Sequence, residues 1–346
     1  MHRVNKPKIV VQKDSRLKNK LSYLITLIFI VTAFSGCSNT SSSENDNKIH
    51  VMATSFPQYD WVRQIIGKDN ENVEVSLLVD SGIDLHSFQP SVEDIAHISN
   101  CDMFIYTGGI SDVWVEDALK ASSKEDRIEI NLLSVLGNEV KDEEHVEGMQ
   151  HEEEHEDHDD GHIHEDESEI DEHIWLSLKN AKKFTTLIAL ELSELDSENA
   201  SKYKENSEKY IEALDVLDSK YEKTVNDAKT KTLLFGDRFP FRYLIDDYDI
   251  DYYAAFAGCS AETEASFETI IFLANKMDEL ELKYVMTLES SDQSIAKTII
   301  DNTKKKDQDI LVLDSIQSVG ADNISLGISY LAIMENNFEV IKKALG

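Results

Sequence analysis

The chain has 346 residues, among them 67 Asp or Glu and 34 Lys or Arg, which gives a formal net charge of −33. Such a charge repels phosphate backbones, so it argues against a nucleic-acid partner, and it concentrates cations near the protein. Its three cysteines are too few for a disulfide framework.

The N-terminus has the pattern of an exported lipoprotein. Seven Lys or Arg and one acidic residue precede residue 21, and an apolar run of 14 residues follows over 21–34. This run is short for a membrane span and typical of a signal-peptide core. Small residues before Cys37 resemble a bacterial lipoprotein processing site, so we predict a signal peptide over 1–36 and a lipid on Cys37. The alternative is an uncleaved signal anchor.

The polar residues 37–47 are then a flexible tether between the lipid bilayer and a folded body. This places the protein on the outer face of the bacterial cytoplasmic membrane. Without residues 1–36 the chain keeps 27 basic and 66 acidic residues, a formal charge of −39. A cation is therefore the favoured partner.

Strand and helix patterns alternate over 48–190, the predicted first lobe. Alternation of this kind is typical of an α/β fold with a mostly parallel sheet and helices on both faces. The expected strands are 48–54, 73–79, 103–106 and 127–130, and the expected helices are 58–66, 92–99 and 113–121.

An acidic, histidine-rich run interrupts this lobe. Residues 142–172 contain 17 Asp or Glu and no Lys or Arg, and six of the chain's 11 histidines fall within it. Imidazole and carboxylate are common ligands of divalent metals, and the run has almost nothing to bury. We therefore expect a disordered accessory metal loop over 142–170; the alternative is a solvated acidic linker. Its histidines are His145, His151, His155, His158, His162 and His164.

A long helical pattern follows, over 191–228. Apolar residues spaced 7, 4, 3, 4 and 4 apart fit one helix face. A helix over 199–228 would be about 45 Å long, enough to cross a whole lobe. The alternative is two helices with a break near Ser207, but no Pro or Gly forces that break. The stripe consists of Tyr203, Tyr210, Leu214, Leu217, Tyr221 and Val225.

A second alternation fills 229–346. Its expected strands are 232–235, 251–253, 284–288 and 310–313, and its expected helices are 264–277, 295–304 and 328–345. The sequence thus predicts two similar α/β lobes joined by one long helix.

Residues of the types that commonly bind metals follow several of the expected strands. In open parallel sheets, ligands bind beyond the carboxyl ends of the strands. Each residue alone has a structural explanation, such as a hydrogen bond or a turn cap, but two His with carboxylates form a workable shell for a divalent metal. Cys101 beside a strand is better explained as a buried small hydrophobe. The candidates are His86, His173, Asp237, Glu289 and Asp314.

Several short motifs follow one another along the chain: 55–60 (SFPQYD), 84–90 (DLHSFQP) with 94–96 (DIA), 171–176 (DEHIWL) and 180–181. With these motifs, residues 48–346 resemble the substrate-binding lipoproteins of bacterial zinc and manganese ABC importers. The acidic histidine-rich insertion is typical of the zinc members.

The resemblance implies a metal held between the lobes by His86, His173 and Asp314. It implies delivery without catalysis to a membrane permease driven by a cytoplasmic ATPase. We expect a monomer.

One ligand position departs from the family pattern. Three residues before a Phe-x-Tyr, where the family has His or Glu, this chain has Arg238, which cannot bind a cation. The neighbouring Asp237 could take the role, or water, Glu289 or Cys259 could complete the shell. Leu85 and Glu172 also stand where the family often has Pro. We expect zinc as the metal and keep manganese open.

Three other functions remain as alternatives. A secreted metal-dependent hydrolase would need an open metal position and a general base, and we find neither an HExxH motif nor a nucleophile elbow. A surface adhesin is compatible with the family, whose lipoproteins have been regarded as adhesins. A metal buffer acting only through the histidine-rich run would leave the two-lobed body unexplained.

Overall fold

The computed structural model describes residues 48–80, 82, 85–122, 124, 126–150, 169–258 and 264–346. The predicted signal peptide, the tether and Cys37 lie outside these residues. So do Cys259 and five of the six histidines of the acidic run, all except His145.

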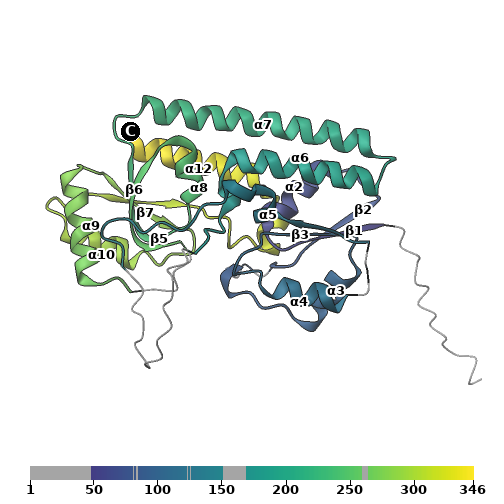
Figure 1. The fold of residues 1–346 in the computed structure, drawn as a ribbon. Helices are drawn as coiled ribbons and strands as arrows, with labels where there is room; N and C mark the ends of the chain where they lie inside the picture. The colour runs from purple at the N-terminus through teal and green to yellow at the C-terminus, as the bar shows by residue number, and fades with distance from the viewer. Residues whose placement is uncertain are drawn as a thin grey trace, which may run out of the picture. The chain divides into compact units, whose positions relative to one another are not determined.

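The first lobe is built on a four-stranded sheet in which all strands are parallel, in the order β2-β1-β3-β4 (Figure 1). Its strands are β1 (Ile49–Ala53), β2 (Val73–Leu77), β3 (Met103–Tyr106) and β4 (Ile128–Asn131). Its helices are α2 (Phe56–Ile66), α3 (Val92–Asn100), α4 (Trp114–Ala121), α5 (Leu132–Leu136) and α6 (Leu178–Leu195), with short 3-10 turns η1 (Leu85–Ser87), η2 (Gly137–Glu139) and η3 (Ile174–Leu176).

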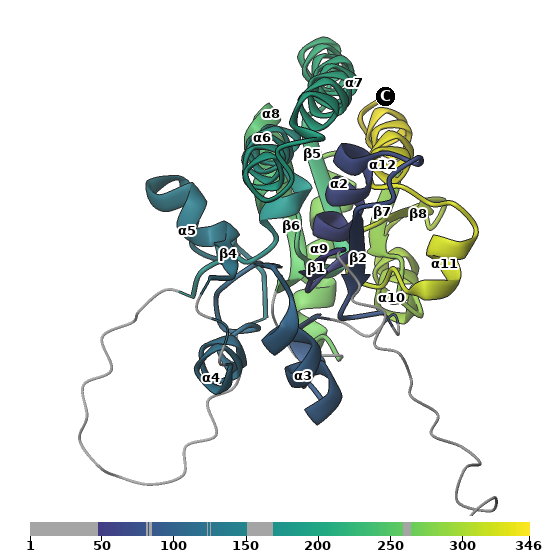
Figure 2. The same cartoon turned by 90° about the vertical axis from the view of Figure 1, so that its right-hand side faces the viewer.

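Helices cover both faces of this sheet. Successive strand residues point to opposite faces. Val51 accordingly joins one hydrophobic cluster with α2 and α6, while Met52 joins another with α3 and α4. Figure 2 shows α3 and α4 on the side away from α6 and α7. Cys101 is buried in the second cluster, as expected of a small hydrophobe.

The second lobe repeats this topology with its own parallel sheet, in the order β6-β5-β7-β8. Its strands are β5 (Thr232–Phe239), β6 (Asp251–Ala257), β7 (Tyr284–Leu288) and β8 (Asp309–Leu313). Its helices are α8 (Arg242–Tyr248), α9 (Phe267–Glu279), α10 (Ser294–Asn302), α11 (Ala321–Ser325) and α12 (Tyr330–Leu345). The prediction of two similar α/β lobes is confirmed.

One helix, α7 (Ala200–Asp227), is continuous through Ser207 over 28 residues, or about 42 Å. It contacts α2 and α6 of the first lobe and α8 and α12 of the second. All six residues of the predicted apolar stripe are buried. The expected start of the linking segment at residue 191 falls inside α6, which ends at Leu195.

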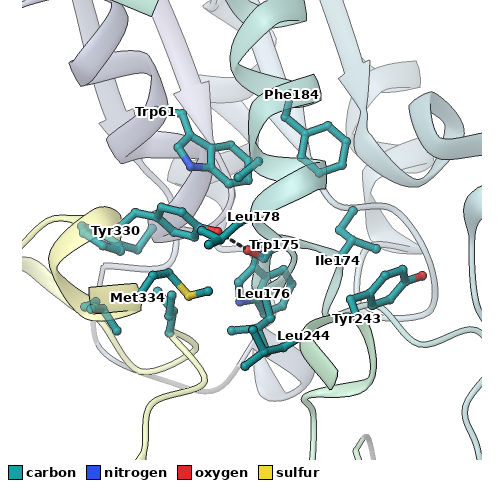
Figure 3. Packing of buried hydrophobic residues seen from close by; sticks show 14 of the residues in the cluster. Trp61, Ile174, Trp175, Leu176, Leu178, Phe184, Tyr243, Leu244, Tyr330 and Met334 are labelled. Carbon is teal, nitrogen blue, oxygen red and sulfur yellow. Dashed lines mark hydrogen bonds between the residues drawn. The ribbon is translucent and has the colours of Figure 1, made fainter. Parts of the chain in front are cut away.

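A single hydrophobic cluster runs from one lobe into the other (Figure 3). Trp61 packs against Phe184 of α6 and edge-on against Tyr330 of α12, with ring centroids 5.6 and 5.4 Å apart. Burial of each such aromatic side chain contributes about 1.5–3 kcal/mol. The Tyr330 hydroxyl also donates to the Trp175 carbonyl at 2.6 Å. The two lobes are therefore joined by packed side chains as well as by α7.

Among the described residues, no helix has both the length and the apolar character needed to cross a membrane.

Candidate metal centre

The structure brings two of the predicted ligands together. His86 lies in η1, after the carboxyl end of β2, and His173 directly precedes η3. Their Nε2 atoms are 3.2 Å apart. Two nitrogens bound at 2.0–2.1 Å to a tetrahedral zinc ion would be about 3.3 Å apart. The spacing of the two imidazoles therefore suits one shared metal ion.

A carboxylate orients the His173 ring. Asp171 Oδ1 accepts a hydrogen bond from the His173 backbone N–H at 2.8 Å and lies 3.0 Å from its Nδ1. When Nδ1 donates a hydrogen bond to Asp171, the ring lone pair that can bind a metal is the one on Nε2. Burial by itself would lower the pKa of His173, but the negative charges of Asp171, Glu143 and Glu172 raise it above its ordinary value.

A hydroxyl and a second carboxylate orient the His86 ring. Ser111 Oγ lies 2.7 Å from His86 Nδ1 and donates a hydrogen bond to Glu172 Oε2. Since the hydroxyl has one proton, its oxygen accepts the Nδ1 proton of His86. With its ring proton on Nδ1, His86 presents a lone pair at Nε2 towards His173 Nε2, where either a cation or a ring proton of His173 can lie between the two nitrogens.

Two further predicted residues form a carboxylate pair in the second lobe. Asp314 follows β8, and Glu289 follows β7. Glu289 accepts hydrogen bonds from the backbone N–H and the hydroxyl of Ser315 at 2.9 and 2.8 Å. Burial, together with the charge of Glu289, raises the pKa of Asp314 to about 6. A cation would relieve the repulsion in this pair.

One hydrogen bond connects the histidine segment to the carboxylate segment. The Trp175 indole N–H donates to the Ser315 carbonyl at 2.9 Å. Trp175 is two residues after His173, with ring centroids 5.4 Å apart, and Ser315 directly follows Asp314. The lobes thus hold these two segments next to each other.

Asp237 lies in a different environment from the one expected. The sequence suggested a strand ending at residue 235, but β5 continues to Phe239 through an irregularity, and Arg238 pairs with Phe256 of β6. Within β5, Gly236 permits close packing, because a Cβ there would lie 2.8 Å from the Ala296 Cα of α10.

The Asp237 carboxylate accepts backbone N–H groups from Arg238 at 2.9 Å and from Leu288 at 3.2 Å. It thereby stabilises the irregular part of β5. Its role as a metal ligand remains a prediction.

No three His, Cys, Asp or Glu side chains of the described ranges form a group that could hold a metal ion. The described site consists of the pair His86 and His173 and, on the adjoining segment, the pair Glu289 and Asp314. The part played by Ser111 was not anticipated from the sequence. The one available signal was Glu172, a carboxylate beside a candidate ligand histidine where the family often has Pro.

The beginning of the acidic insertion is ordered, which corrects the expectation of disorder over the whole of 142–170. Asp142 and Ile170 form an antiparallel bridge at its base. Beyond the base, the Gln150 backbone N–H donates to the Ala255 carbonyl of β6 at 3.0 Å, and Met149 is buried. The first residues of the insertion therefore pack on the second lobe, because Met149 supplies the apolar contact that the composition suggested was lacking.

A cavity of about 900 Å³ lies between this segment and the second lobe. Both of its basic lining residues are paired with acidic ones, since Lys141 contacts Asp246 at 2.7 Å and Arg242 contacts Glu144. Its lining contains none of the five candidate ligands, so the histidine pair is the stronger metal-site candidate.

Solved structures share this fold. The metal-dependent lipoprotein YcdH from Bacillus subtilis superposes with a TM-score of 0.68 at 26% identity, covering 86% of this chain and 99% of that one. Zn(II)-bound AdcA from Streptococcus pneumoniae gives a TM-score of 0.66 at 24% identity, covering 86% of this chain and 58% of that one. The laminin-binding protein Lmb of Streptococcus agalactiae, described as having adhesin and metal-transporting activity, has 20% identity and shows the fold alone.

Relatives found by sequence are also described as zinc proteins. The high-affinity zinc uptake system protein ZnuA of Bacillus subtilis is 29% identical over 325 residues, which cover 93% of this chain and 96% of that protein. The zinc-binding lipoprotein AdcA of Streptococcus pneumoniae is 28% identical over 311 residues, which cover 89% of this chain but 57% of its own length. Residues 51–344 match the family described as ZnuA, zinc-uptake complex component A periplasmic. These relatives are uptake and binding proteins and not enzymes, and the chain belongs to this zinc-uptake family.

Proposed function

We propose that this protein is an extracytoplasmic lipoprotein that captures zinc between its two lobes and delivers it to an ABC permease. The observation that carries the proposal is the facing pair of imidazole Nε2 atoms, 3.2 Å apart. Each ring has its Nδ1 within hydrogen-bond distance of an oxygen, so Nε2 is the ring atom that would bind a metal. The names of the relatives support zinc as the cargo.

In this proposal His86 and His173 bind zinc from the first lobe, and Asp314 contributes from the second. Asp237 is a further candidate ligand, with Glu289 or water as alternatives. Nitrogen and oxygen sites favour zinc over manganese in the general order of affinity, although two His with carboxylates also suit manganese. The accessory histidines of the insertion would gather zinc at lower affinity.

The finer parts of the proposal concern location and partners. Cys37 would be lipidated and would anchor a monomer in the bilayer, on the outer face of the cytoplasmic membrane. The permease and its ATPase would take the metal inward. The B. subtilis relative is named as part of an uptake system, and the S. pneumoniae relative is named as a lipoprotein, which supports both points.

Zinc titration of the mature chain, by calorimetry or by competition with a chromophoric chelator, tests the proposal. We expect binding tighter than micromolar for the wild type. The double variant His86→Ala/His173→Ala should lose it, and His97→Ala, on the exposed face of α3, should keep it. A variant without residues 151–168 should also keep the tight site. Wild-type zinc and manganese binding no tighter than micromolar would refute the proposal.

A further inference from the structure

We infer that Glu172 and Ser111 form a positioning relay that fixes the ring of His86 for zinc. This inference rests on the proposed function and adds two residues to its site. Neither residue would touch the metal. Their role would be to hold one ligand in its binding orientation, with its ring proton on Nδ1 and its Nε2 unprotonated.

The bonds of the relay are continuous. The Ser111 backbone N–H donates to Glu172 Oε1 at 3.0 Å, and the Ser111 hydroxyl donates to Glu172 Oε2. The same hydroxyl oxygen lies 2.7 Å from His86 Nδ1. Glu172 Oε2 is itself 3.6 Å from that nitrogen. Both carboxylate oxygens are thus engaged by the residue that contacts the histidine.

The number of protons available determines which atom donates each hydrogen bond of the relay. A carboxylate only accepts hydrogen bonds, so the single hydroxyl proton of Ser111 must point to Glu172. The hydroxyl oxygen can then only accept from the imidazole, which places the ring proton on Nδ1. The negative charge of Glu172, transmitted through the hydroxyl, makes Nε2 more basic and a better metal ligand.

The backbone around Glu172 is shaped to hold its carboxylate. The side chain is 2% exposed. Gly109 has a φ of +81°, and a Cβ on it would lie 2.1 Å from Glu172 Oε1. The Trp114 indole N–H donates to the Ser111 carbonyl at 3.0 Å and secures the other side of the loop. Such a close fit around a buried charge fixes the position of Ser111, and through it the position of His86.

The relay makes its hydrogen bond to His86, while the charge of Glu172 also acts on His173. His173 has its own partner, Asp171, so the chain supplies a separate carboxylate for each ring. Partners of this kind typically change metal affinity by about 10–100-fold when they are removed. We expect this loss for Ser111→Ala and a comparable loss for Glu172→Gln. Because both residues act through one chain of bonds, their double variant should lose little more than the more damaging single variant.

Two measurements test the relay. Zinc affinity is measured for Ser111→Ala, Glu172→Gln, the double variant and Ser111→Thr, with Ser134→Ala on the exposed surface of α5 as the control. In parallel, ring ¹⁵N NMR of the metal-free protein at mildly alkaline pH reports the His86 tautomer. The wild type and Ser111→Thr should show the proton on Nδ1. Ser111→Ala should show a mixture of tautomers, which a merely structural role would not produce.

The outcomes separate the relay from the proposed function. If the wild type binds zinc tightly, and Ser111→Ala binds as tightly with an unchanged His86 tautomer, the relay is refuted and the function stands. If the wild type does not bind zinc, the function fails and so does any role of the relay in zinc binding. Weaker binding by Ser111→Ala with a mixed tautomer, both restored by Ser111→Thr, would support the relay.

Discussion

Replacing Gly109 with alanine tests how firmly the fold holds the Glu172 carboxylate. The residue has a left-handed φ of +81°, and the added Cβ would lie 2.1 Å from Glu172 Oε1 and 2.7 Å from its Cδ. These distances are far below van der Waals contact. Glu172 is buried, so its side chain cannot swing away into solvent. The substitution should therefore displace the carboxylate from Ser111.

The size of the effect follows from two contributions. A non-glycine residue in the left-handed region costs about 1–2 kcal/mol. Each hydrogen bond to a charged group contributes about 1.5–3 kcal/mol, and Glu172 would lose two, from the N–H and the hydroxyl of Ser111. The free energy of unfolding should fall by about 4–8 kcal/mol, a large part of the 5–15 kcal/mol typical of folded proteins.

Gly327→Ala is the matched control. Gly327 has nearly the same φ, +84°, but nothing lies within 4 Å of its added Cβ. Gly327→Ala should lower the free energy of unfolding only by the backbone contribution, about 1–2 kcal/mol. Chemical denaturation of both variants without metal measures the difference, since bound zinc would add its own stabilisation. If Gly109→Ala were no less stable than Gly327→Ala, the tight enclosure of Glu172 would be refuted.

Three further predictions concern α7 and the proposed metal ligands. Leu214→Ala, in the buried stripe of α7, should lower the free energy of unfolding by about 2–5 kcal/mol. Val216→Ala, at a residue that is 54% exposed on the same helix, should change it by less than about 0.5 kcal/mol. Equal effects of the two substitutions in chemical denaturation would contradict a single packed α7. Asp171→Asn should weaken zinc binding about 10–100-fold, because His173 loses its charged partner; unchanged affinity in chelator competition would argue against that role. Because neighbouring carboxylates raise the pKa of His173, protons should compete with zinc at a higher pH than for an ordinary histidine. Affinity should thus be greatest above that pKa and decline as the pH falls through it, and a flat pH profile in calorimetry would exclude His173 as a ligand.

Much of the fold could be predicted from local pattern. The periodicity of apolar residues identified every strand of both sheets, and β3 and β7 lie at the expected bounds. The apolar stripe on α7 could be predicted equally well, because the residues of one helix face recur at regular spacing in the sequence whatever the face packs against. The positions of His86 and Asp314 after expected strands followed from the general rule for parallel sheets.

Local pattern misled where packing decides the backbone. The pattern suggested a strand that ends at residue 235, but β5 continues to Phe239, and Gly236 within it allows α10 to approach closely. The acidic insertion suggested disorder throughout, but its start packs on the second lobe through Met149 and Gln150. In both cases the deciding partner lies far away in the sequence, so composition within the segment carried no signal.

The sequence by itself determined the two lobes, the long helix, and the histidines that end up as neighbours. Only the tertiary structure decided how those histidines are held. Ser111 is 25 residues from His86 and 61 from Glu172. They meet because β2 and β3 are parallel and lie on either side of β1, so the loops after them open at the same edge of the sheet. Pairwise contacts of this kind depend on strand order, which the pattern of residues within each strand does not encode.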